Sequence, residues 1–206
     1  MLWLIVGYLL GSFPSAYVFS RLLGGRDVRR VGSGNVGGMN ALRNVNVAAG
    51  LLTIVFDVGK GALAVWLAGR YGAGAAGALQ GGGPVLGGGA NWSPLAAAVG
   101  VVVGHNWMLF LGFEGGKGLG ATVGALFVLK PVLVLVFVGL IGLGALVTRD
   151  TNVGAGLAAL TLPLVFWWAG RGDGAWLAAG AALGLAVAAK HWPDFKAYRA
   201  GRRQLV

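Results

Sequence analysis

Two glycine-rich loops carry the residues best suited to bind phosphate. The first loop reads Gly32-Ser33-Gly34-Asn35-Val36-Gly37-Gly38, and the second reads Gly115-Gly116-Lys117-Gly118. Glycine lets the backbone turn its N–H groups toward an anion, and a neighbouring cation such as Lys117 supplies the compensating charge. The two loops together predict a site for a phosphorylated ligand.

Both loops also match part of a nucleotide-binding motif, but neither has the required context. The spacing of Gly32, Gly34 and Gly37 fits the dinucleotide fingerprint, which must follow a buried strand, whereas this loop follows the charged residues 26–30. A P-loop that used Lys117 would need glycine at position 111 and Ser or Thr at position 118, where the chain has leucine and glycine. Nucleotide binding by either motif is therefore excluded.

The composition predicts an integral membrane protein with a single domain over residues 1–206. Of the 206 residues 57% are hydrophobic and only 11% are charged, which is too little polar surface to cover a soluble domain. The absence of cysteine excludes disulfides and thiolate catalysis. With only two histidines and six acidic residues, no metal site is expected.

Seven apolar stretches predict an all-α transmembrane bundle. A helix that rises about 1.5 Å per residue needs about 20 residues to cross a hydrocarbon core of about 30 Å. The stretches cover residues 1–22, 47–69, 94–112, 119–130, 132–147, 153–170 and 174–190. The first lacks a basic leader and is expected to be retained, and residues 71–93 are expected to form a flexible external turn.

The topology depends on whether residues 119–147 form one helix or two, with Lys130-Pro131 as the expected break. If residues 119–147 form two helices, the chain has seven spans, and only Arg70, Lys130 and Arg171 lie on the side of the membrane opposite to the other Lys and Arg residues outside the spans or at their ends. If they form one helix, the chain has six spans and the basic residues divide evenly between the two sides. The positive-inside rule favours seven spans, with the N-terminus outside and the C-terminus and both glycine-rich loops in the cytoplasm. Because residues 119–130 would reach only about 18 Å, the loop before them is expected to dip into the membrane.

The ionisable residues Asp57, Lys60 and His105 lie in the interior of the apolar stretches. Asp57 and Lys60 are three residues apart, so they share a helix face and are expected to neutralise each other as a structural pair. His105 lies near the cytoplasmic end of the third stretch. Taken alone, it is more typical of a hydrogen-bonded helix linker than of a catalytic group.

The order of these elements resembles a known enzyme family. The elements are Gly11-Ser12-Phe13-Pro14, the first loop with Asn40 and Arg43, Asp57-Val58-Gly59-Lys60-Gly61, Gly104-His105-Asn106 and the second loop. The chain is similar over nearly its whole length to the bacterial acyl-phosphate-dependent glycerol-3-phosphate acyltransferases. The resemblance implies a seven-helix enzyme of the bacterial inner (plasma) membrane that transfers a fatty acyl group from acyl phosphate to the sn-1 hydroxyl of glycerol 3-phosphate. The expected partners are these two substrates and membrane lipid, with no cofactor, metal or nucleic acid.

The resemblance also implies roles for individual residues. Ser33, Lys117 and His191 would be catalytic, and together with Arg43 they would bind glycerol 3-phosphate. The backbone of residues 115–118 would hold the acyl phosphate and polarise its carbonyl. The proton acceptor stays open between His191 and a substrate phosphate oxygen. The other residues expected to bind substrate are Asn35, Asn40, His105, Gly115, Gly116, Gly118, Arg149, Asn152 and Asp194.

Three residues depart from the family pattern, and two alternatives to an active acyltransferase stay open. Met39 stands where threonine is usual, Asn152 replaces a serine, and Asp194 replaces an asparagine. A relative with impaired catalysis that only binds phosphate or phospholipid is the first alternative. A transporter of small phosphorylated solutes is the second, and it is less favoured because no inverted half-repeats are evident.

Overall fold

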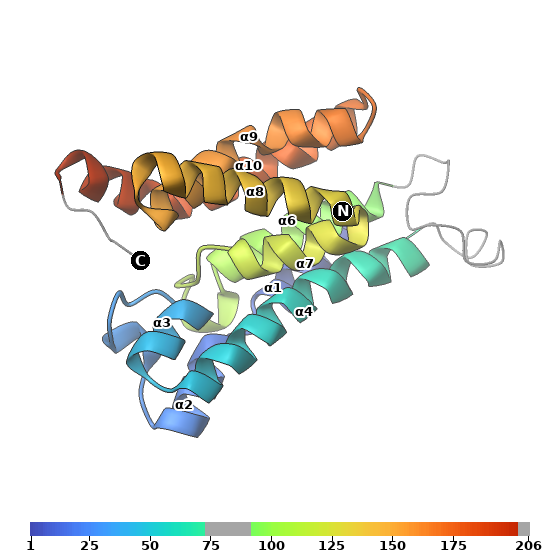
Figure 1. The fold of residues 1–206 in the computed structure, drawn as a ribbon. Coiled ribbons are helices and arrows are strands. Elements are labelled where there is room, and N and C mark those ends of the chain that lie inside the picture. Colours follow the sequence, from blue (N-terminus) through green and yellow to red (C-terminus); the bar gives the residue numbers. More distant parts are fainter. Residues whose placement is uncertain (73–91, 202–206) are drawn as a thin grey trace.

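The computed structural model describes residues 1–72 and 92–201, and every regular element within them is a helix (Figure 1). The all-α prediction is thus confirmed for the described part of the chain, while residues 73–91 of the expected external turn lie outside it. The α-helices are α1 (Leu2–Gly11), α2 (Ser15–Gly24), α3 (Gly38–Asn44), α4 (Val47–Tyr71), α6 (Ser93–Asn106), α7 (Leu119–Leu129), α8 (Pro131–Thr148), α9 (Thr151–Ala169) and α10 (Gly174–Arg199). Two single-turn 3-10 helices, η1 (Val28–Arg30) and η2 (Leu109–Leu111), lie between them.

Five stretches of the described chain are long and apolar enough to cross a membrane. They are Leu2–Gly24, Val47–Tyr71, Ser93–Leu111, Pro131–Thr148 and Thr151–Ala169, and α7 is a shorter apolar helix. Large apolar side chains point away from the protein, among them Leu135, Leu146 and Val147, each more than 70% exposed. Outward apolar side chains on such helices are typical of contact with lipid. The number of seven spans and the orientation of the chain remain predictions.

Two breaks shape the helices. Lys130 has extended backbone between α7 and α8, so the predicted break before Pro131 is confirmed. A second break was not anticipated, because residues 1–22 were read as one stretch: α1 ends at Gly11, and Pro14 caps the start of α2. Proline lacks an N–H and clashes with the preceding turn, so a continuous helix is not maintained there.

Close backbone packing joins α1 to α6. Gly7 and Gly11 on α1, and Gly100 and Gly104 on α6, each face a backbone carbonyl of the opposite helix so closely that a Cβ atom would not fit. Spacing of small residues by four is a common way for membrane helices to approach each other. This close contact with α6 holds α1 against the centre of the bundle.

The helices form an elongated bundle with the loops of interest gathered at one end (Figure 1). The golden helix α8 and the orange to red helices α9 and α10 lie together along one side, while α4, α6 and α7 lie along the other. Helices α2 and α3 lie at the end where α10 finishes, opposite the start of α1. This end therefore brings chain segments that are far apart in sequence to one place.

Candidate active site

The first glycine-rich loop is held in shape by Asn40, in the first turn of α3. Its side-chain Nδ2 donates to the carbonyl oxygens of Val28, Val31 and Asn35 at 2.9, 3.1 and 3.0 Å, and its Oδ1 accepts the backbone N–H of Ser33 at 3.2 Å. A single buried amide therefore fixes the loop on both sides of Ser33. No helix was expected between the apolar stretches 1–22 and 47–69, so α3 is a feature that the sequence pattern did not predict.

The second loop rests on the end of α6. The backbone N–H of Gly116 donates to the carbonyl oxygen of His105 at 3.0 Å, and a Cβ atom on Gly116 would collide with the His105 ring. Gly118 adopts a left-handed conformation with φ of 84° directly before α7. Glycine tolerates this conformation without strain, and it directs the chain from Lys117 into the helix.

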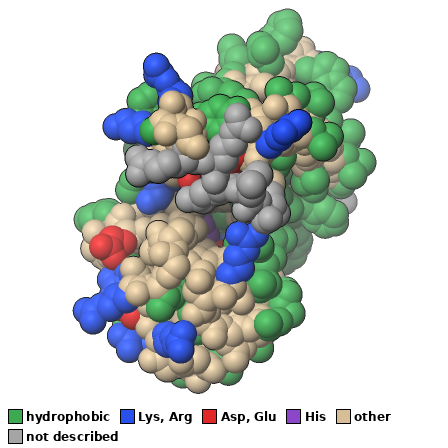
Figure 2. Space-filling model, turned by 60° about the vertical axis from the view of Figure 1, so that its left-hand side comes forward, with side chains coloured by type: hydrophobic (Ala, Val, Ile, Leu, Met, Phe, Trp, Pro, Cys, Tyr) green, Lys and Arg blue, Asp and Glu red, His purple; other side chains and the backbone are tan. Residues whose placement is uncertain are grey.

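Both loops line one cavity of about 1220 Å³. Ser33, Asn35 and Arg43 come from the first loop and α3, Lys117 and Gly118 come from the second loop, and Asn152 and Asp194 come from α9 and α10. Figure 2 views the end of the molecule that holds the cavity, where Lys and Arg side chains gather, while hydrophobic side chains dominate away from it. The arrangement places a cavity lined by basic side chains next to apolar, membrane-type surface.

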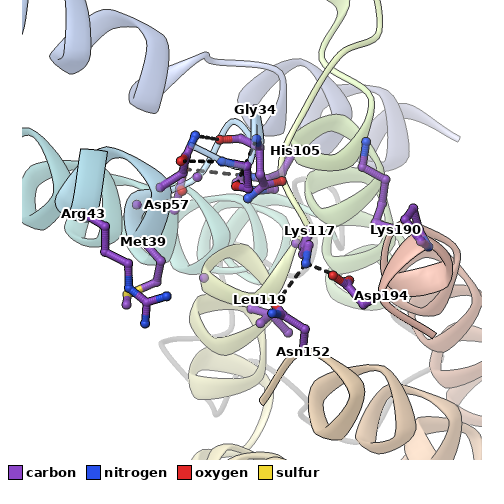
Figure 3. A pocket seen from close by; sticks show the side chains of 18 of the residues that line it. Gly34, Met39, Arg43, Asp57, His105, Lys117, Leu119, Asn152, Lys190 and Asp194 are labelled. Carbon is purple, nitrogen blue, oxygen red and sulfur yellow. Dashed lines mark hydrogen bonds and ion pairs between the residues drawn. The ribbon is translucent and has the colours of Figure 1, made fainter. Parts of the chain in front are cut away.

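Lys117 is anchored by two helices that are distant in sequence. Its Nζ donates to Asp194 Oδ2 at 2.7 Å and to Asn152 Oδ1 at 2.9 Å (Figure 3). On the other flank of the same view, Arg43 and Met39 lie side by side on α3. Asn152 and Asp194, both expected from the sequence to bind substrate, thus contact this lysine directly.

The structure brings most of the expected site residues together, but not all. Besides the residues above, Asn40, Asp57 and His105 line the cavity. The lining residues do not include Gly115, Gly116, Arg149 or His191. Arg149 is exposed at the turn after α8, and Gly115 and Gly116 pack against the end of α6.

His191 is buried behind the wall of the cavity. Its side chain is 0% exposed, and its Nδ1 lies 2.9 Å from the carbonyl oxygen of Val187, four residues earlier on α10. Its Nε2 is buried without a hydrogen-bond partner in the described structure. The expected catalytic ring is therefore one helical turn from Asp194 but has no surface on the cavity.

Two cations of the cavity were missed by the sequence reading. Lys190 and Lys196 on α10 both line it, and the Nζ of Lys190 also lies 5.6 Å from the centre of the Trp107 ring. Lys190 is the last residue of the apolar stretch 174–190, so it entered the sequence analysis only as one of the basic residues counted for the positive-inside rule. Its spacing of four residues from Asp194 puts both on one helix face, which is the signal that could have found it.

A buried charged network lies beneath the second loop. Asp57 Oδ1 accepts a hydrogen bond from Ser15 Oγ at 2.6 Å, lies 2.9 Å from Lys60 Nζ, and lies 3.4 Å from His105 Nδ1. Lys60 also donates to the carbonyl oxygen of Phe13 at 3.1 Å, at the break between α1 and α2. The Asp57–Lys60 pair expected from the sequence is confirmed, but it is part of a larger network that includes His105.

An ion-pair cluster ties the two loop regions together at the surface. Arg29 donates to Asp27 at 2.9 Å and to Glu114 at 3.1 Å, so it connects η1 to the residue that precedes Gly115. The hydrogen bonds from Arg29 lower the pKa of Asp27 from 3.8 to about 2. Asp27 therefore remains charged over the physiological pH range, and the cluster connects the first loop region to the second.

Comparison with known proteins places this arrangement in a family. The family model described as "Glycerol-3-phosphate acyltransferase" matches residues 1–201. The "Glycerol-3-phosphate acyltransferase 1" of Moorella thermoacetica is 37% identical over 92% of this chain and 88% of its own length, and that of Dehalococcoides mccartyi is 38% identical over 82% and 77%.

Solved structures agree with the sequence comparisons. The glycerol 3-phosphate form of PlsY (YgiH), an integral membrane glycerol 3-phosphate acyltransferase, superposes with a TM-score of 0.80 at 25% identity over 100% of this chain and 94% of that one. Its lysophosphatidic acid form gives a TM-score of 0.76 at 24% identity. Both loops, the network beneath them and the multi-pass helical bundle are accounted for by one conclusion: the chain belongs to the glycerol-3-phosphate acyltransferase family of integral membrane proteins.

Proposed function

We propose that the protein transfers a fatty acyl group from acyl phosphate to the sn-1 hydroxyl of glycerol 3-phosphate. The products are 1-acylglycerol 3-phosphate and inorganic phosphate. The reaction takes place at the cytoplasmic face of the bacterial inner membrane, where the acyl donor is held in the lipid and glycerol 3-phosphate arrives from water.

One observation carries the proposal: Ser33 and Lys117, on loops 84 positions apart in the numbering, line the same cavity together with Arg43. Both substrates bear phosphate, and a cavity surrounded by Arg43, Lys117 and Lys190 supplies the positive charge that both require. The relatives that carry the acyltransferase name, and the glycerol 3-phosphate and lysophosphatidic acid forms of PlsY, support this substrate class.

The chemistry needs little beyond positioning and charge neutralisation, because acyl phosphate is already activated. The glycerol hydroxyl oxygen attacks the acyl carbonyl carbon, a C–O bond forms, and the bond from that carbon to the phosphate oxygen breaks as phosphate leaves. Arg43 and Ser33 orient the phosphate of glycerol 3-phosphate, and Lys117 neutralises the charge that develops on the leaving phosphate.

We assign the proton acceptor to a phosphate oxygen of the substrate. His191, the alternative, is enclosed within the protein and has one ring nitrogen engaged with Val187. A phosphate oxygen is already beside the hydroxyl and becomes more basic as the acyl group leaves. His191 instead supports α10 at the turn that carries Asp194 to Lys117.

The proposal is tested with purified protein, an acyl phosphate, labelled glycerol 3-phosphate and a metal chelator, with thin-layer detection of lysophosphatidic acid. Wild-type protein is expected to form product from acyl phosphate, and acyl-CoA serves as the competing donor. Lys117→Ala is expected to lower transfer by roughly 100-fold or more, which is the cost of removing one positioned charge from a reacting site. Arg70→Ala, which removes an exposed cation at the C-terminal end of α4, is the matched control.

Three outcomes contradict the proposal. Transfer that requires acyl-CoA refutes the donor assignment. Full activity of Lys117→Ala, in a variant that retains wild-type thermal stability, refutes the site. Glycerol 3-phosphate binding by wild-type protein without any turnover identifies the impaired binder instead.

A further inference from the structure

Lys117 does not face the cavity as an unpaired cation. Its ammonium group is 2.7 Å from Asp194 Oδ2 and 2.9 Å from Asn152 Oδ1, so two of its three N–H donors are in use. The side chains of Lys117 and Asp194 are only 21% and 11% exposed. Partly buried charges are screened much less than surface charges, so the carboxylate acts on its surroundings at close range.

Asp194 is also the acidic side chain of the cavity whose charge an incoming anion meets. The other acidic lining residue of the described chain, Asp57, is already balanced by Lys60 at 2.9 Å and hydrogen-bonded to Ser15. Asp194 is balanced by Lys117, the same lysine that a phosphate needs. A phosphate must therefore either take Lys117 from the carboxylate or bind beside a like charge, and both options weaken its binding.

We propose that Asp194 is an internal competitor for Lys117 that sets the affinity of the cavity for phosphate-bearing ligands. Asp194 is thus a determinant of affinity rather than a ligand of the substrate. The inference rests on the proposed function only for naming glycerol 3-phosphate as one of those ligands. Weaker binding of phosphate favours turnover, because both products carry phosphate and have to leave the cavity. Uniformly tight binding of anions gains no rate once the site is filled.

The test compares Asp194→Asn with wild-type protein in direct binding measurements without acyl donor. Asparagine keeps an oxygen that can accept from Lys117 and removes the charge. Calorimetric titration with inorganic phosphate and with glycerol 3-phosphate is expected to show about tenfold tighter binding to the variant, the order of magnitude for removing one partly screened like charge. Neutral glycerol is expected to bind both proteins equally. The matched control is Asp173→Asn, at the opposite end of α10, where asparagine still caps the helix.

The outcomes separate this inference from the proposed function. Tighter phosphate binding by Asp194→Asn supports the inference even if neither protein transfers an acyl group, in which case the proposed function fails alone. Equal or weaker phosphate binding by the variant overturns the inference. Loss of kcat in the acyl-transfer assay with unchanged phosphate affinity also overturns it, because Asp194 would then act in the chemical step and not on affinity. If Asp194→Asn does not fold, Asp194→Ser removes the same charge and carries the same expectation.

Discussion

Replacement of Gly116 by alanine tests whether the second loop depends on close contact with His105. A methyl group at this position would lie closer than 3.0 Å to Nε2 of His105 and 2.8 Å from the carbonyl oxygen of Val36. Ordinary van der Waals contact begins at 3.4 Å, so either the ring or the loop has to move. The ring cannot move freely, because His105 is 3% exposed and lies 3.4 Å from Asp57, which is itself paired with Lys60.

The size of the effect of Gly116→Ala depends on whether the His105 ring or the loop moves. Added volume in a packed region costs about 1–3 kcal/mol, and a misplacement of about 1 Å in a reacting site costs about 100-fold in rate. We therefore expect Gly116→Ala to lower acyl transfer by about 100-fold while the free energy of unfolding falls by only about 1–3 kcal/mol. The control is Gly59→Ala on α4, where nothing lies within 4 Å of the added methyl and alanine favours the helix.

The assay is acyl transfer from acyl phosphate, measured beside thermal unfolding in the same detergent. A Gly116→Ala variant with wild-type kcat and KM would refute the reasoning, because the loop would then tolerate displacement of Lys117. Equal losses in Gly116→Ala and Gly59→Ala would also refute it, since they would point to a general effect of added methyl groups.

Three further predictions concern the residues that hold the site together. Asp57→Ala leaves the Lys60 charge buried without its partner and is expected to lower the free energy of unfolding by about 3–5 kcal/mol. The double variant Asp57→Ala/Lys60→Ala should regain part of that stability, and additive losses would contradict the network. Asn40→Ala leaves carbonyl groups of the first loop without a donor and is expected to cost about 2–4 kcal/mol and to raise the KM for glycerol 3-phosphate, so an unchanged KM would argue against the role of Asn40. Because the pKa of Asp27 is lowered to about 2 in the folded protein, its contribution to stability should be complete above pH 4 and lost as the pH falls toward 2, and Asp27→Asn should flatten that part of the stability curve measured by denaturant titration.

Local patterns in the sequence were sufficient for the helices and for contacts within one helix. The break before Pro131 and the pairing of Asp57 with Lys60 follow from proline chemistry and from helical spacing, and both are confirmed. The break at Pro14 was missed because apolar residues lie on both sides of the short segment 11–15, so hydropathy averaged over a whole span runs through it. Hydropathy reports burial in lipid and not the continuity of the backbone hydrogen bonds.

Contacts between residues that are far apart in the chain could not be predicted from the sequence. The approach of His105 to Asp57 joins residues on α6 and α4, and the pairing of Lys117 with Asp194 joins a loop to the end of α10. No periodicity encodes which helices become neighbours in a bundle of similar apolar helices. The resemblance to a family named residues of the site, but only the packing shows that Lys117 is bound to a carboxylate.

The close contact of α1 with α6 has a consequence for how the chain assembles during synthesis. Gly7 and Gly11 meet a partner whose glycines lie roughly 90 residues later, which at about 5–20 residues per second separates the two helices by about 5–20 seconds of translation. Throughout that interval the groove formed by Gly7 and Gly11 has no matching surface, although α4, which also packs against α1, is already made. Docking of α1 against α6 therefore has to follow the synthesis of α6, and a substitution in the groove should impair the packing of helices that have already been inserted.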